Sequence, residues 1–101
     1  MSVRIRITPE AEAQAESAAA WWRGNRPGAP ALFGDELAGA LTLLSAAPEA
    51  GPRYRRRGVP GLRRLLLPRT RYHVYYLYDA EAGVCMVAAV WGAVRGRGPR
   101  V

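Results

Sequence analysis

The length and composition of the chain suit one compact domain. Its 101 residues are 50% hydrophobic and 23% charged, and independent domains usually hold about 100 to 150 residues. We therefore expect a single domain over residues 1–101, ending in a tail from about residue 95 to residue 101. The longest nearly apolar run, Val84–Val94, is shorter than the roughly 18 to 20 residues of a membrane-spanning helix. The N-terminus does not resemble a secretory signal, so we expect a cytoplasmic protein with no membrane partner.

The single cysteine and the single histidine argue against several kinds of chemistry. Cys85 has no second thiol to pair with, and His73 is the only imidazole. Zinc cages and nucleophile–histidine triads need ligands or partners that this composition hardly supplies. We therefore expect no metal and no cofactor, and we assign Cys85, which alternates with apolar neighbours, to the core.

Charge is unevenly distributed along the chain. All fifteen basic residues are arginine, against eight acidic residues, and the formal net charge is +7. Residues 1–50 hold four arginines and six acids, whereas residues 51–101 hold eleven arginines and two acids. This asymmetry favours an anionic partner for the C-terminal half, such as nucleic acid, an acidic protein segment or a phosphate-rich surface. The alternative is that a GC-rich genome favours arginine and that a basic surface keeps a small domain soluble.

The N-terminal half is predicted to form one strand and two helices. Arginine alternates with aliphatic residues over Val3–Ile7, which is typical of a short strand. Thr8 supplies a hydroxyl N-cap and Pro9 a first-position proline, so a helix is predicted over Pro9–Asn25. A short connection rich in proline and glycine follows, and a second helix with regularly spaced apolar residues is predicted from about Ala31 to Ala46. The two helices should form an antiparallel hairpin.

The C-terminal half is predicted to form a three-stranded antiparallel meander. Gly61–Leu67, Arg71–Asp79 and Val84–Trp91 are rich in β-branched, aromatic and aliphatic residues and are separated by turn residues. The segment Arg53–Gly58 fits a basic loop or the start of a short strand better than a linker, because Tyr54 interrupts the charge and proline and glycine flank it. The expected fold is therefore α+β, with an N-terminal strand and a helical hairpin packed on an antiparallel β-sheet.

Several sequence segments, taken in this order and at this spacing, resemble the RelE/ParE superfamily of toxins from bacterial type II toxin–antitoxin systems. The resemblance covers nearly the whole chain and implies a toxin neutralised by a cognate antitoxin, ParD-like or of another family, in a hetero-oligomer. The segments are Thr8–Ala11, Ala20–Arg23, Arg63–Pro68, Tyr72–Tyr76 and Val90–Pro99.

The superfamily has one branch that cleaves messenger RNA on the ribosome and another that inhibits DNA gyrase. In the RNA-cleaving branch the resemblance implies basic side chains at alternate sheet positions. Arg64 matches the first such position, but Leu66 occupies the second and His73 falls where a strand arginine would be. An aliphatic side chain cannot stabilise phosphate charge, and arginine is a poor base at neutral pH. Relatives commonly place a histidine after the tryptophan at position 91, where this chain has Gly92. The residues therefore favour the gyrase-directed, ParE-like branch.

The resemblance assigns candidate residues to two surfaces. The surface that contacts the target is expected to comprise Arg63, Arg64, Arg69, Arg71, Trp91, Arg95 and Arg97. The antitoxin is expected to cover the groove between the helical hairpin and the sheet, and its contacts are assigned to Trp22, Leu37, Leu41 and Leu44. Two alternatives remain open, namely a ribosome-dependent nuclease that uses Arg64, His73 and Arg95, and a detoxified homologue that only binds antitoxin.

Neighbouring arginines on a strand point to opposite faces of the sheet. One of Arg63 and Arg64 must therefore point toward the helices, where we expect it to extend its charge to the surface or to pair with Asp35 or Glu36.

The large aromatic residues and the C-terminal tail each have a structural interpretation. Trp22, Tyr72 and Trp91 are expected to fill the core of a small domain, although Tyr72 and Trp91, with arginine neighbours, also suit stacking on nucleic-acid bases. The tail has no apolar anchor except Val101, so we expect it to be mobile until a partner orders it.

Overall fold

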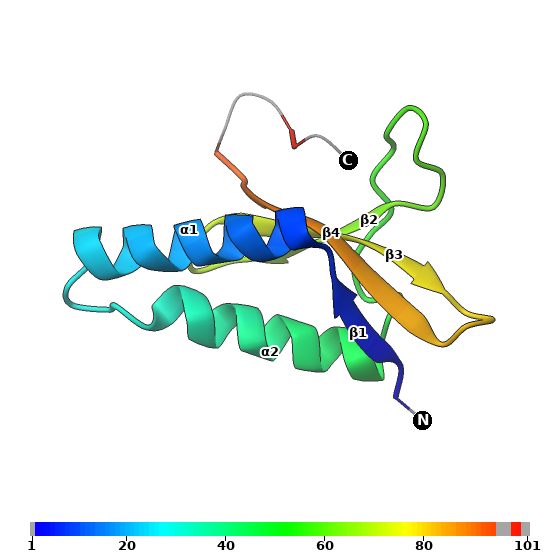
Figure 1. Cartoon of the computed structure of the whole chain (residues 1–101), viewed down its shortest axis with the longest axis horizontal. Helices are drawn as coiled ribbons and strands as arrows, with labels where there is room; N and C mark the ends of the chain where they lie inside the picture. Colours follow the sequence, from blue (N-terminus) through cyan, green and yellow to red (C-terminus); the bar gives the residue numbers. More distant parts are fainter. Residues whose placement is uncertain (1, 95–97, 100–101) are drawn as a thin grey trace.

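Two helices cover one face of a four-stranded sheet (Figure 1). The computed structural model of the chain describes residues 2–94 and 98–99. Along the chain the elements are β1 (Arg4–Ile7), α1 (Pro9–Asn25), α2 (Leu32–Ala46), β2 (Arg63–Leu67), β3 (Tyr72–Asp79) and β4 (Val84–Gly92). The predicted α+β class and the predicted order of elements are confirmed. Neither helix is long and apolar enough to cross a membrane within this part of the chain.

The sheet is mixed, with the strand order β1-β4-β3-β2. Strands β2, β3 and β4 form the predicted antiparallel meander. Strand β1 lies parallel to β4, with Ile5 opposite Cys85. This parallel pairing was not predicted, because it joins segments about 80 residues apart and no local turn signals it. It fills the edge of β4 that the meander leaves unpaired.

Helix α1 begins and ends at the predicted residues. The Thr8 hydroxyl accepts a hydrogen bond from the Ala11 amide (3.1 Å), and Pro9 occupies the first turn, where no amide hydrogen is needed. Helix α2 begins at Leu32, one residue later than predicted, and has no side-chain cap.

A bulge in β4 aligns two valines with the helices. Tyr75 lies opposite Ala89 and Tyr76 opposite Val87, so Ala88 is the extra residue. Val87 and Val90 consequently both lie in the core with the helices, although they are three residues apart.

Side chains of α1 and its cap satisfy backbone groups of β4 where β1 has ended. Gln14 accepts a hydrogen bond from the Val90 amide (2.7 Å), and the Thr8 hydroxyl donates to the Ala88 carbonyl (3.3 Å). Edge groups that would otherwise lack a partner strand are thereby paired.

The main core lies between the helices and the sheet. Ala11 and Ala18 are its contribution from α1, and such small side chains allow a helix and a sheet to approach closely. Phe33 packs edge-to-face on Tyr72 with ring centroids 5.0 Å apart. Cys85 is fully buried here, as predicted.

A smaller apolar cluster covers part of the opposite face, which we call the outer sheet face. Leu62, Tyr75 and Ala89 are its buried members. Tyr54, from the predicted basic loop, packs edge-to-face on Tyr75 with ring centroids 5.4 Å apart. The loop before β2 therefore belongs to the folded domain and is not a linker.

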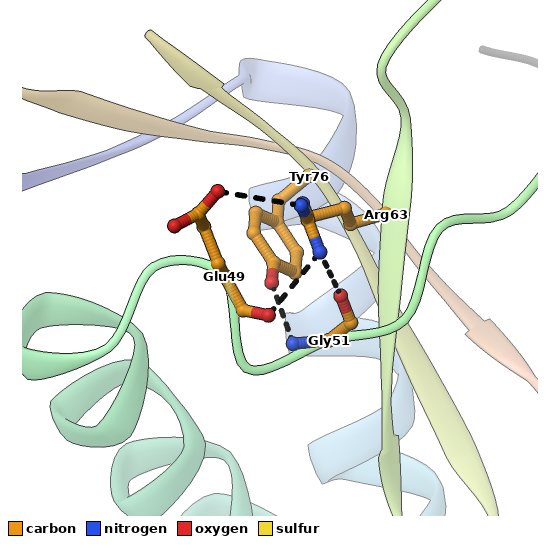
Figure 2. A network of polar contacts seen from close by, with 4 residues as sticks. All are labelled: Glu49, Gly51, Arg63 and Tyr76. Carbon is orange, nitrogen blue, oxygen red and sulfur yellow. Dashed lines mark hydrogen bonds and ion pairs between the residues drawn. The ribbon is translucent and has the colours of Figure 1, made fainter. Parts of the chain in front are cut away.

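A polar network fastens the segment after α2 to β2 and β3 (Figure 2). The Gly51 amide donates to the buried hydroxyl of Tyr76 (2.8 Å), and the Arg63 guanidinium donates to the Gly51 carbonyl (2.8 Å). Arg63 also donates to the Glu49 carbonyl (3.2 Å) and lies 3.6 Å from its carboxylate. Of the two expected outcomes for the arginine that points toward the helices, pairing with Asp35 or Glu36 is wrong for Arg63, because its acidic partner is Glu49.

Part of the C-terminal tail is packed against the domain. Pro99 is buried, and the Arg56 guanidinium donates a hydrogen bond to its carbonyl. The prediction of a mobile tail is wrong for Gly98 and Pro99, because the sequence pattern did not show that the basic loop provides a packing surface. The tail residues 95–97 and 100–101 lie outside the described residues.

Candidate functional site

An apolar groove runs between the two helices, and we call it the interhelical groove. It encloses about 210 Å³. Leu37 and Leu41 of α2 line one side, Ala15 and Ala19 of α1 line the other, and Phe33 also contributes. Glu12 and Glu16 are the only charged residues among those that line it within the described chain. The chemistry of the groove suits an apolar helix face from a partner.

The residues predicted to bind antitoxin do not all reach this groove. Leu37 and Leu41 lie in it and are half-buried. Leu44 is fully buried in the core, and this burial removes it from any surface that a partner touches. Trp22 packs partly on the core, as predicted, and lines a different groove on α1. Helical spacing shows which residues share a face but does not show how deeply each is buried.

A larger groove lies between the second half of α1 and the ends of β3 and β4. We call it the arginine–tryptophan groove, and it encloses about 890 Å³. Three residues predicted to contact the target, Arg69, Arg71 and Trp91, line it. The charged or aromatic residues that line this groove are Trp21, Trp22, Arg26, Arg69, Arg71, Tyr72 and Trp91.

The turn between β2 and β3 carries two of these arginines and is held from two sides. On one side, the Glu36 carboxylate accepts hydrogen bonds from the Arg69 amide (2.7 Å), the Thr70 amide (2.9 Å) and the Thr70 hydroxyl (2.7 Å). On the other side, the Arg71 carbonyl accepts from the Ala93 amide (2.7 Å). Arg71 has a φ of 65°, which is unfavourable for a residue with a side chain. The contacts on both sides hold this conformation.

The hydrogen bonds to Glu36 stabilise its charged form. Burial alone raises the pKa of Glu36, but the hydrogen bonds from Thr70 and the Arg69 amide, together with the charge of Arg69, bring the net pKa below its ordinary value. Glu36 is therefore ionised at neutral pH and holds the turn as a carboxylate.

The outer sheet face brings together the residues of the nuclease alternative. Arg64 lies opposite Tyr75, and His73 lies opposite Leu66 on one side and Trp91 on the other. The Arg64 guanidinium stacks 4.2 Å from the centroid of the Tyr54 ring. Of the predicted catalytic residues, Arg64 and His73 share this face, whereas Arg95 lies outside the described residues.

The electrostatics of this face favour a neutral histidine. Burial lowers the pKa of His73, and the positive charges of Arg64 and Arg71 lower it further. A neutral imidazole can accept a proton at pH 7. The neighbouring Leu66 is 37% exposed and supplies no charge. Arg64 and His73 are thus available on this face for proton transfer and charge stabilisation, but no second cation occupies the position of Leu66.

Arg63 is committed to the polar network of Figure 2. Its side chain is 14% exposed and donates to two backbone carbonyls. We therefore leave it out of the proposed target surface. Arg97, like Arg95, lies outside the described residues.

Sequence reasoning missed three residues of these surfaces. Trp21 is 46% exposed, and the Arg26 guanidinium lies 5.1 Å from the centroid of its ring. The sequence signal for an exposed Trp21 was its position next to Trp22, since adjacent residues on a helix cannot both point at the core. Tyr54 was placed in a loop, and its position inside a run of arginines indicated a packing role.

The fold and these surfaces define a RelE/ParE-like toxin. The family model of the ParE toxin of the type II toxin–antitoxin system parDE matches residues 5–95. The chain therefore belongs to the ParE toxin family of type II toxin–antitoxin systems. Among curated proteins, no sequence is significantly similar to it.

Solved structures of toxin–antitoxin systems share the fold at low sequence identity. The chromosomal ParDE system of Pseudomonas aeruginosa matches with a TM-score of 0.71 and 15% identity, covering 90% of this chain and 96% of that chain. The RelBE2 complex of Mycobacterium tuberculosis matches with a TM-score of 0.65 and 18% identity, covering 91% and 99%. The intact RelBE complex of Escherichia coli matches with a TM-score of 0.61 and 21% identity, covering 93% and 100%.

Proposed function

We propose that this toxin acts in the bacterial cytoplasm by binding and inhibiting DNA gyrase, without cutting RNA. The observation that carries the proposal is the composition of the outer sheet face. Cleavage by a ribose 2′-hydroxyl needs a base and cations around the phosphate. His73 supplies the base and Arg64 supplies one cation. The sheet position at which a second cation would be needed is occupied by Leu66.

The rate acceleration that RNA cleavage requires also favours a binding mechanism over a nuclease. A millionfold acceleration requires about 8 kcal/mol of transition-state stabilisation, and one proton-transfer group contributes about 10²- to 10⁴-fold. His73 supplies one such factor, so Arg64 alone would have to supply the remaining factor of about 10² to 10⁴ by stabilising charge, with no second cation at Leu66. A binding mechanism needs only a complementary surface, which we assign to Arg64, the arginine–tryptophan groove and the tail residues Arg95 and Arg97.

We further propose that a cognate antitoxin neutralises the toxin by placing an apolar helix face in the interhelical groove. The nearly apolar lining around Leu37 and Leu41 supports this assignment. Acidic residues of the same antitoxin would face the C-terminal half, which carries eleven of the fifteen arginines. The solved relatives named above include toxin–antitoxin complexes, which is consistent with a hetero-oligomer.

A ribosome-dependent nuclease is the second candidate function. The observation that favours it is the neutral His73 beside Arg64 on the outer sheet face. A homologue that has lost toxicity and keeps only antitoxin binding is the third.

Induced expression in a bacterial host separates these functions. We expect growth arrest, loss of negative supercoiling in a reporter plasmid and intact transcripts. Transcript ends at the decoding site that disappear in His73→Ala would establish the nuclease instead. Normal growth with retained antitoxin binding would establish the detoxified homologue.

A further inference from the structure

The arginine–tryptophan groove combines cations with one exposed and three half-buried aromatic rings, and no acid lines it in the described part of the chain. Arg26, Arg69 and Arg71 are exposed, and none of the residues that line the groove in the described part of the chain is aspartate or glutamate. Within residues 2–94 and 98–99 these three guanidinium groups form no ion pair. The groove therefore presents net positive charge along its wall, although the Glu36 carboxylate behind the turn interacts with the charge of Arg69.

Flat apolar surfaces lie beside these charges. Trp21 is 46% exposed, and its ring packs edge-to-face with Trp22 at a centroid distance of 6.0 Å. Arg26 lies within 5.8 Å of both ring centroids. The lining runs along α1 from Ala13 to Trp22 and ends at Arg26, the residue that follows the helix, over a length of about 20 Å. The groove is thus long enough for an extended chain.

The structure maintains a strained backbone to place one of the cations. Arg71 keeps its φ of 65° because the turn is bonded to Glu36 on one side and to Ala93 on the other. Strained residues that the surrounding structure holds in place tend to occur at functional sites.

We infer that the arginine–tryptophan groove binds single-stranded nucleic acid. Arg69 and Arg71 contact backbone phosphates, and unpaired bases stack on Trp21 and the neighbouring rings, as in other binders of single strands. An acidic peptide would use the same guanidinium groups, but a nucleotide also supplies a planar base to the indole of Trp21, which stays 46% exposed beside Arg26 and Trp22. The combination of planar rings and cations therefore favours a nucleic-acid strand.

This inference does not depend on gyrase being the target. The groove lies at the end of the sheet beside α1 and adjoins the outer sheet face at Trp91, which lies opposite His73, but neither Arg64 nor His73 lines it. Binding is measured on the isolated toxin, so its failure leaves the gyrase proposal unchanged.

The first test is the anisotropy of a fluorescein-labelled oligothymidylate of about twelve nucleotides, a length within the range of single-strand sites. The double variant Arg69→Ala/Arg71→Gly removes both cations, and glycine accepts the positive φ at position 71 without strain. We expect binding to weaken and the slope of log affinity against log salt to become shallower by about 1.4.

A charge-matched control separates the groove from general attraction. Arg4→Ala/Arg6→Ala removes two exposed arginines of β1, which do not line the groove. We expect this variant to bind the oligonucleotide much more tightly than the groove variant. Equal losses in the two double variants would overturn the inference, as would a wild-type chain that does not bind at low salt.

A third variant tests stacking. Trp21→Ala should weaken binding by about fivefold or more, and Trp21→Phe should restore part of the affinity. Thermal melting reports whether each variant is folded, and Trp21 is exposed enough to be replaced at small cost. If polyglutamate of equal charge displaces the oligonucleotide as well as unlabelled oligothymidylate does, the groove takes acidic peptides and the inference is wrong.

Discussion

Glu36 of α2 and Thr70 of the β2–β3 turn are joined by two hydrogen bonds to one carboxylate oxygen, at 2.9 Å from the Thr70 amide and 2.7 Å from its hydroxyl. The other carboxylate oxygen accepts from the Arg69 amide at 2.7 Å. The Glu36 side chain of α2 therefore fixes the β2–β3 turn, and this turn holds Arg69 and Arg71 at the arginine–tryptophan groove.

Glu36→Gln should lower the free energy of unfolding by about 1 to 3 kcal/mol at neutral pH, because one of the two acceptor oxygens becomes an NH₂ group and the bonds that remain lose their charged acceptor. Glu16→Gln, at an exposed position of α1, is the control and should change the free energy of unfolding by less than about 0.5 kcal/mol. Chemical denaturation of both variants measures these changes. Equal effects would show that the contact with Thr70 does not stabilise the turn.

The contribution of Glu36 to the free energy of unfolding should decrease as the pH falls. Its pKa lies below the ordinary value in the folded chain, so the unfolded chain takes up the proton more readily. The stabilisation is fully present above the ordinary pKa of about 4.5 and is lost as the pH falls through the lower, folded pKa. The stability difference between wild type and Glu36→Gln should therefore shrink in acid. A difference that grows as the pH falls would contradict the sign of the shift.

Gly51→Ala should destabilise the fold by about 1 to 3 kcal/mol or more, as overpacking does. The added methyl group would lie 2.7 Å from the Tyr76 hydroxyl and 3.0 Å from the Arg64 carbonyl. Gly39→Ala is the matched control, since its methyl group meets nothing within 4 Å, and alanine favours the interior of α2 by about 0.5 to 1 kcal/mol. In urea denaturation, the midpoint of Gly51→Ala should lie below that of the wild type, and the midpoint of Gly39→Ala should lie above it. A Gly51→Ala midpoint equal to the wild-type one would refute the tight contact with Tyr76.

Cys85 should resist alkylation in the folded toxin. Burial raises the pKa of its thiol to about 11, so at pH 8 only about one thiol in a thousand is ionised. Iodoacetamide labelling followed by mass spectrometry should be slow in buffer and fast in denaturant. Labelling at the unfolded rate without denaturant would show that the core around β4 opens easily.

Leu37→Asp should weaken antitoxin binding by more than tenfold, because a carboxylate in the interhelical groove cannot be solvated once a partner covers it. Leu43→Asp is the control, as Leu43 is 45% exposed on the same helix and does not line the groove. Calorimetry with the antitoxin encoded beside the toxin measures both affinities, and melting curves establish that both variants are folded. Equal affinities would place the antitoxin on another surface.

Local signals in the sequence were sufficient for the elements and for parts of the site. Thr8 and Pro9 specify the start of α1 through a cap and a fixed φ, and both ends of that helix were predicted correctly. The parallel pairing of Ile5 with Cys85 could not be predicted, because it is a contact between distant segments. The bulge at Ala88 was missed as well, since it is a shift of register between β3 and β4 that no turn residue signals.

The candidate surfaces show the same division between local pattern and tertiary context. Arg69, Arg71 and Trp91 were chosen as basic and aromatic residues, and the fold brings them together. Arg63 and Leu44 have the same local pattern as their neighbours in the sequence. In the structure, however, Arg63 donates hydrogen bonds to the backbone carbonyls of Glu49 and Gly51, and Leu44 is buried in the core. Which of several similar side chains faces a partner depends on packing that periodicity does not encode.

The supercoiling of relaxed plasmid by purified gyrase, with increasing amounts of the purified toxin, tests the central proposal most directly. We predict that the toxin blocks supercoiling, that His73→Ala blocks it equally well, and that added antitoxin restores it. Undiminished supercoiling at a large excess of folded toxin would contradict the account.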